Sequence, residues 1–101
     1  MDGAWTDAEQ KTLRTFVIDG RIVKLPRKQS KRHVVYRWLL EQLKRQLPEG
    51  QWLPEMEISE RIRPFHPDVA TIRRELYEFG FLEREKNTYR RPPSAPPSDA
   101  G

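Results

Sequence analysis

The chain has 101 residues, a formal net charge of +4 and no cysteine. This length fits one domain with a modest core, and the lack of thiols excludes disulfides, thiol catalysis and the usual structural zinc sites. No signal peptide opens the sequence and no apolar run approaches membrane-spanning length, so we expect a cytoplasmic protein with no membrane contact and no cofactor.

The positive charge is concentrated in one part of the chain. Residues 21–48 hold nine lysines and arginines against Glu41 alone, which gives +8. The segments 1–20 and 49–86 are both net acidic. An anionic partner is therefore expected to meet the second quarter of the chain first.

The first predicted elements are a short helix and a β-hairpin. Thr6-Asp7-Ala8-Glu9 has the spacing of a capping box, which predicts a helix over residues 7–14. Asp19-Gly20 separates residues 15–18 from residues 21–25, two runs rich in β-branched side chains. This dipeptide favours a two-residue hairpin turn, because both central residues of that turn take positive φ.

A long helix is predicted over Lys31–Leu47, with Ser30 as its N-cap. Its apolar residues form two adjoining stripes, which are Val34, Val35, Trp38 and Leu39, and then Tyr36, Leu40, Leu43 and Leu47. Such a wide apolar arc indicates contact with two neighbours. Those neighbours are either other elements of the same chain or, alternatively, a second copy or a regulator protein.

Two shorter helices follow. Pro54 and the glutamates after it are typical of a helix start, which predicts a helix to about Arg63. A third helix is predicted from Pro67, since one face of it carries an apolar residue every three or four positions and Gly80 then ends it. The residues of that face are Phe65, Val69, Ile72, Leu76 and Phe79.

A second hairpin is predicted after Gly80, with strands at residues 81–85 and 88–91 around Lys86-Asn87. The order of elements predicts an α+β fold, namely a small winged helix-turn-helix-like domain with an added N-terminal helix and β-hairpin. We expect a helical extension over residues 1–15, the winged-helix-like domain over residues 16–91, and a disordered proline- and serine-rich tail over residues 92–101.

Along residues 16–91 the chain resembles the bacterial family called domain of unknown function 2087. The resemblance rests on Asp19-Gly20-Arg21-Ile22, Pro26-Arg27-Lys28 with Lys31-Arg32, Glu57-Ile58, Asp68 to Leu76, Gly80 to Arg84, and Tyr89. Members of that family occur alone or joined to helix-turn-helix regulatory domains. The segment Thr71–Leu76 also resembles the recognition helix of DeoR-type repressors, which implies DNA binding and transcription regulation.

Candidate nucleic-acid contacts fall in three groups. The segment 26–32 carries four cations beside a predicted helix start, a pattern that favours phosphate binding. Its candidates are Arg27, Lys28, Lys31 and Arg32. The third helix offers Thr71, Arg73 and Arg74, and the second hairpin offers Arg84, Lys86 and Arg90. The helical projection points Arg74 outward and puts Arg73 near the edge of the core face, where a carboxylate can pair with it.

No residues have the spacing of a metal site, a phosphate-cradling glycine loop or a nucleophile–base pair, so we expect no enzyme activity. The sequence therefore predicts a nucleic-acid-binding module, with duplex DNA as the first choice. The alternative is a protein–protein or dimerisation module that uses Lys31–Leu47 and binds no nucleic acid.

Overall fold

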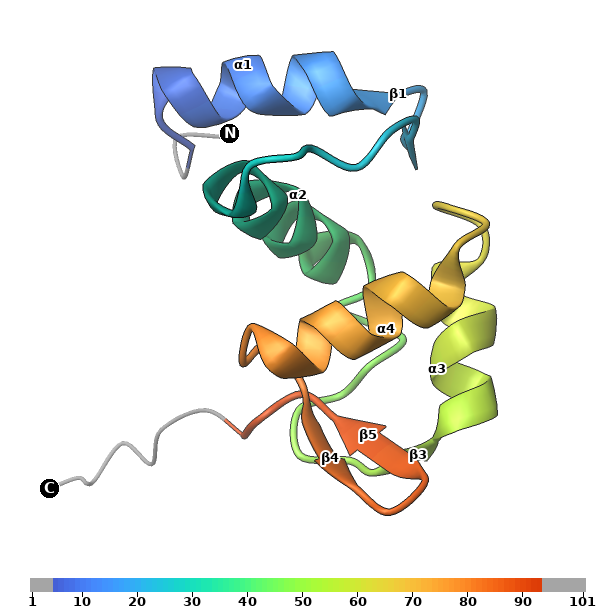
Figure 1. The fold of residues 1–101 in the computed structure, drawn as a ribbon. Helices are drawn as coiled ribbons and strands as arrows, with labels where there is room; N and C mark the ends of the chain where they lie inside the picture. Colours follow the sequence, from blue (N-terminus) through green and yellow to red (C-terminus); the bar gives the residue numbers. More distant parts are fainter. Residues whose placement is uncertain (1–4, 94–101) are drawn as a thin grey trace, which may run out of the picture.

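A computed structural model of the protein describes residues 5–93 (Figure 1). In chain order its elements are α1 (Asp7–Phe16), β1 (Val17–Ile18), β2 (Arg21–Ile22), α2 (Gln29–Gln42), β3 (Leu53–Pro54), α3 (Glu55–Ile62), α4 (Val69–Glu78), β4 (Glu83–Glu85) and β5 (Thr88–Arg90). Most of the predicted tail lies outside the described residues.

The N-terminal helix and hairpin form as predicted, with different boundaries. The capping box of α1 is complete: the Thr6 hydroxyl accepts from the Glu9 N–H at 3.1 Å, and the Glu9 carboxylate accepts from the Thr6 N–H at 3.0 Å. Asp19 and Gly20 take φ values of 53° and 74°, as the hairpin turn requires. The helix continues to Phe16, which packs against the core, so the prediction of a strand at residues 15 and 16 was wrong.

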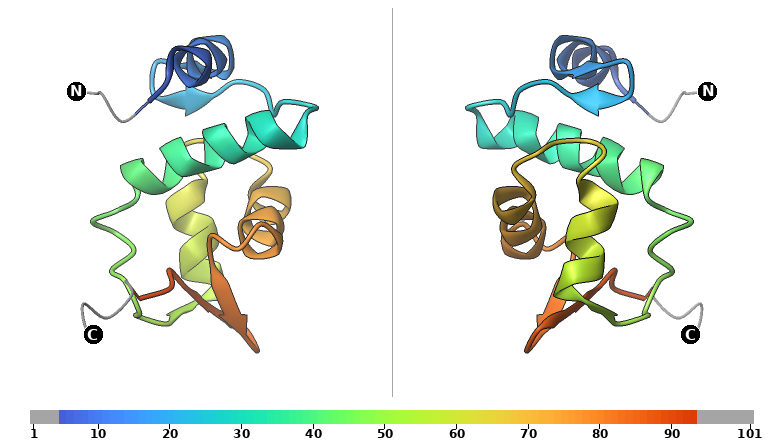
Figure 2. Two further views of the ribbon diagram at one scale, coloured as in Figure 1. Left: turned by 90° about the vertical axis from the view of Figure 1, so that its left-hand side faces the viewer. Right: turned by 90° about the vertical axis from the view of Figure 1, so that its right-hand side faces the viewer.

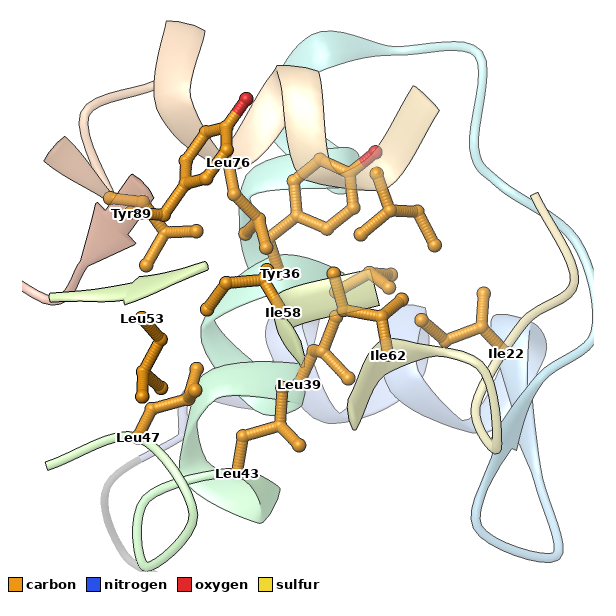
Figure 3. Close-up of a cluster of buried hydrophobic side chains, with 13 residues drawn as sticks. Ile22, Tyr36, Leu39, Leu43, Leu47, Leu53, Ile58, Ile62, Leu76 and Tyr89 are labelled. Atoms are coloured by element: carbon orange, nitrogen blue, oxygen red, sulfur yellow. The ribbon is translucent and has the colours of Figure 1, made fainter. Parts of the chain in front are cut away.

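The long helix α2 carries the centre of the core. It begins at Gln29, and the residue at its N-cap is Lys28 with no side-chain cap, so the assignment of Ser30 as N-cap was wrong. Regular helix ends at Gln42, and hydrogen-bonded turns carry the chain on to Leu47. Figure 3 shows side chains of α2 and of these turns converging with those of α3 and α4.

Burial within the chain accounts for both apolar stripes of α2. The first neighbour is the core side, where Tyr36, Leu39 and Leu43 are fully buried. The second is α1, which packs against α2. Trp38 and Leu40 are half-buried at the edge of the core, where the Trp38 ring meets the Phe65 ring edge-on. The prediction that this helix contacts two neighbours is confirmed.

Three short strands form a sheet in the order β3-β5-β4. Leu53 pairs with Tyr89 and Pro54 with Thr88, while Glu83 in β4 pairs with Arg90. The strand β3, which lies between α2 and α3 in the chain, thus pairs with β5, the second strand of the C-terminal hairpin. This is the arrangement of a winged helix-turn-helix, with β4 and β5 as the wing (Figure 1).

The helix α4 is fixed at both ends. Asp68 is its N-cap and accepts from the Thr71 N–H at 3.3 Å, so the helix starts two residues later than the predicted Pro67. At the other end Gly80 has a φ of 85°, which a residue with a side chain rarely adopts. The N–H groups of Phe81 and Leu82 then close on the Leu76 carbonyl, which directs the chain into the wing.

Loss of the Asp68 cap should loosen α4. Asp68→Ala is expected to lower the free energy of unfolding at pH 7 by about 1 kcal/mol, because the Thr71 N–H loses its acceptor. Hydrogen bonding by Thr71 lowers the pKa of Asp68 in the folded state. The cap therefore contributes fully above the ordinary pKa of about 3.9, and its contribution disappears as the pH falls through the lowered value. Urea denaturation of parent and variant at pH 7 and pH 2.5 should show the difference shrinking in acid; an equal difference at both would contradict this role.

Candidate nucleic-acid interface

Three features predicted to contact nucleic acid lie along one side of the domain. Figure 2 shows α4 close to end-on, with the start of α2 above it and the tip of the wing below it on the same side. The end of α2 lies on the opposite side. A partner that covers the outer face of α4 is therefore flanked by the segment 26–32 and by the β4–β5 turn.

Three of the four cations in the segment 26–32 point into solvent. Arg27, Lys28 and Lys31 are exposed and make no side-chain hydrogen bond or ion pair with any residue from 5 to 93. Arg32 instead points inward. Its guanidinium donates to the carbonyl oxygens of Pro26 at 3.2 Å and Arg27 at 3.4 Å.

The Arg32 side chain also belongs to a small polar cluster between α2 and α4. Its Nε lies 3.4 Å from the Glu75 carboxylate as an ion pair, and that carboxylate accepts a hydrogen bond, at 2.5 Å, from the Tyr36 hydroxyl. Burial of Tyr36 and the bond to Glu75 raise the pKa of that hydroxyl well above its ordinary value. The cluster joins α4 to the start of α2, so Glu75 places no free negative charge on the outer face.

On the outer face of α4 the exposed residues are Ala70, Arg74, Tyr77 and Glu78. The side chain of Arg74 is 59% exposed, and its Nε lies 3.7 Å from the Glu78 carboxylate, a separation at which an exposed pair contributes little. Thr71 is half-buried at the start of the helix. Arg74 is thus the cation of α4 that is available to a partner.

Arg73 serves packing instead. Its guanidinium donates to the Ser59 hydroxyl at 2.5 Å and lies 3.3 Å from the Glu55 carboxylate. The predicted pairing of Arg73 with a carboxylate at the edge of the core face is confirmed. These contacts fix α4 against α3 and leave Arg73 poorly placed to reach a groove.

The wing likewise has two exposed cations and one that is paired within the domain. Lys86 occupies the exposed turn with a φ of 55°, and Arg84 is exposed with its guanidinium 5.2 Å from the centre of the Tyr77 ring. Arg90 is held inside by Glu83 at 2.6 Å and stacks on Trp52 at 4.5 Å.

The stack of Arg84 on Tyr77 joins the wing to the outer face of α4, and sequence reasoning missed Tyr77. Tyr77 is 43% exposed although it is aromatic. The available signal was its position three residues after the outward-pointing Arg74, which places both on one helical face. An exposed aromatic ring beside two arginines is a surface suited to nucleic acid.

Within residues 5–93, no group of three or more histidine, aspartate or glutamate side chains could hold a metal ion. None of the helices described there is long and apolar enough to cross a membrane.

The chain order and the strand order together define a small α+β domain of the winged-helix class, with a helix and a hairpin added at its start. The family model described as an uncharacterized protein conserved in bacteria, DUF2087, matches residues 21–91. The chain belongs to this family. The match begins five residues later than the predicted start at residue 16 and leaves out α1 and β1. No curated protein and no solved structure matches the chain, and the likeness of Thr71–Leu76 to DeoR-type repressors stays a prediction.

Proposed function

We propose that the protein is a cytoplasmic, duplex-DNA-binding module that acts in transcription regulation, on its own or as an accessory to a regulator, and that it is not an enzyme. The helix α4 enters the major groove, where Arg74 and Tyr77 face the base edges. The segment 26–32 and the tip of the wing hold phosphates on either side and so set the orientation of the helix.

The observation that supports this proposal is the sorting of the arginines and lysines. Arg32, Arg73 and Arg90 are tied to carboxylates inside the domain. Of the candidate cations, those that remain exposed belong to the segment 26–32, the outer face of α4 and the wing, which lie on one side of the domain (Figure 2). They are Arg27, Lys28, Lys31, Arg74, Arg84 and Lys86. A phosphate backbone is the partner for which such a row is suited, since each neutralised phosphate releases counterions.

The charge of α4 supports the proposal once its partners are considered. By sequence the segment 66–79 has a net charge of −1, since Asp68, Glu75 and Glu78 outnumber its two arginines, and such a charge would repel phosphate. However, Glu75 is engaged by Arg32 and Tyr36, and Glu78 lies beside Arg74. Glu75 therefore adds no free carboxylate to the outer face, and the exposed cations beside the helix oppose the charge of Glu78.

Self-association through α2 has less support. The residues that suggested it are buried or half-buried within the domain. The large apolar side chains that are exposed within residues 5–93 are Ile18, Val23, Trp52, Met56 and Tyr77, and none of them belongs to α2. A docking partner would find no apolar stripe on this helix.

A matched pair of double variants tests the proposal. Arg27→Gln with Lys28→Gln removes two charges before the start of α2, and Lys44→Gln with Arg45→Gln removes two charges just after its end, on the opposite side. Fluorescence anisotropy titrations with a random duplex across several salt concentrations give the slope of log affinity against log salt. The first variant is expected to lower the magnitude of that slope by about 1.8, at about 0.9 for each lost phosphate contact.

The second variant is expected to keep the parental slope, because its residues face away from the duplex. Equal slopes for parent and both variants would remove the segment 26–32 from the interface. If the Lys44 and Arg45 variant lost more of the slope than the Arg27 and Lys28 variant, the interface would lie at the end of α2, on the opposite side of the domain.

A further inference from the structure

The start of α2 and the helix α1 enclose a hollow of about 290 Å³. Both helices contribute to it, and it is lined by Ala8, Lys11, Thr12, Thr15, Phe16 and Lys31. No acidic residue is among them. Because Lys31 belongs to the segment 26–32 as well, the hollow continues the row of exposed cations beyond α2.

Three of the four polar side chains around this hollow have no partner within residues 5–93, and the fourth, Thr15, bonds a backbone carbonyl. Lys11 and Lys31 are exposed and pair with no carboxylate in the described part of the chain. Thr12 as a residue is 9% exposed, and its hydroxyl makes no hydrogen bond to any residue from 5 to 93. In a helix such a hydroxyl ordinarily bonds the carbonyl four residues earlier, as Thr15 does with Lys11 at 3.0 Å.

We propose that this hollow is a phosphate subsite, in which Lys11 and Lys31 neutralise the charge and the Thr12 hydroxyl donates to a phosphate oxygen. Two ammonium groups and one free hydroxyl donor are the chemistry that a phosphate needs. The subsite rests on the proposed function, and its ligand is a backbone phosphate of the bound duplex beyond those held by the segment 26–32.

The subsite assigns a role in DNA binding to the N-terminal helix α1. Lys11 and Thr12 lie before Arg21, where the match to the family begins. Binding by these residues would therefore be an addition made by α1 to the surface that the family domain supplies. The addition lengthens the path of duplex that the protein covers.

The test compares Lys11→Gln with Arg14→Gln, which removes the same charge from α1 but does not line the hollow. With the full chain and one random duplex, Lys11→Gln is expected to lower the magnitude of the log–log salt slope by about 0.9, and Arg14→Gln to leave it unchanged. Thr12→Val keeps the shape and removes the hydroxyl, so it should weaken binding about two- to tenfold with the slope unchanged. Thermal melts confirm that each variant is folded.

If the parent binds duplex and Lys11→Gln retains its slope, the subsite is wrong while the proposed function stands. If the parent binds no duplex at low salt, the proposed function fails and inorganic phosphate alone tests the hollow. If inorganic phosphate shifts the amide signals of Lys11, Thr12 and Lys31, and Lys11→Gln abolishes these shifts, then the hollow binds free phosphate. The absence of such shifts would overturn it.

Discussion

Ile72→Ala and Leu76→Ala are each expected to lower the free energy of unfolding by about 2–5 kcal/mol, because each deletes buried methyl groups and leaves a cavity. Both side chains are fully buried beneath α4. The exposed neighbour Arg74 supplies the control, and Arg74→Ala should stay within about 0.5 kcal/mol of the parent. Urea denaturation measures all three. Alanine variants that unfold at the parental midpoint would mean that α4 faces the core with a different side.

Glu75→Leu is expected to cost about 1–3 kcal/mol, because it leaves the Tyr36 hydroxyl buried without a partner. Tyr36 is fully buried, whereas Arg32 can turn toward water. Glu78→Leu on the outer face is the control and should have little effect. Adding Tyr36→Phe to Glu75→Leu should recover part of the loss, since it removes the orphaned donor. No recovery would mean that the hydroxyl does not depend on Glu75.

The same bond gives a signature in alkali. The pKa of Tyr36 is raised in the folded state above its ordinary value of 10. The protonated hydroxyl therefore stabilises the fold fully below pH 10, and this contribution declines as the pH rises above 10 toward the folded-state pKa. Denaturation from pH 8 to pH 11.5 should show the parent losing more stability than Tyr36→Phe. Parallel losses in the two proteins would contradict the shift.

Local signals in the sequence were sufficient to predict most of the elements. The apolar repeat of α4 ends at Gly80, and the Asp19-Gly20 turn sits between two β-branched runs, so periodicity and turn chemistry point to the same structure. The strand β3 was missed because it has two residues, one of them proline, and carries no alternating pattern. Its pairing with β5 is decided by how the wing docks on the core.

The candidate interface was harder to predict than the fold. Sequence reasoning named ten candidate contact residues. Three of them, all arginines, are engaged by other residues of the domain. Their partners lie far along the chain or on another element: Arg32 pairs with Glu75, Arg73 with Ser59 and Glu55, and Arg90 stacks on Trp52. A helical projection shows which way a side chain points but not which carboxylate the tertiary fold brings to it. For Tyr77 the helical projection was sufficient to show an outward position, but its contact with Arg84 of the wing depends on the tertiary fold.

We propose that duplex DNA binds one side of this domain, formed by the segment 26–32, the outer face of α4 and the tip of the wing. Amide chemical shifts of the full chain, followed by NMR as a random duplex is added at low salt, test it most directly. The expected result is a set of shifts centred on Lys28, Lys31, Arg74, Tyr77 and Lys86 that diminishes as salt is raised, with Lys44 and Arg45 unmoved. A spectrum that does not change at saturating duplex, or shifts confined to the end of α2 and to α3, would contradict the claim.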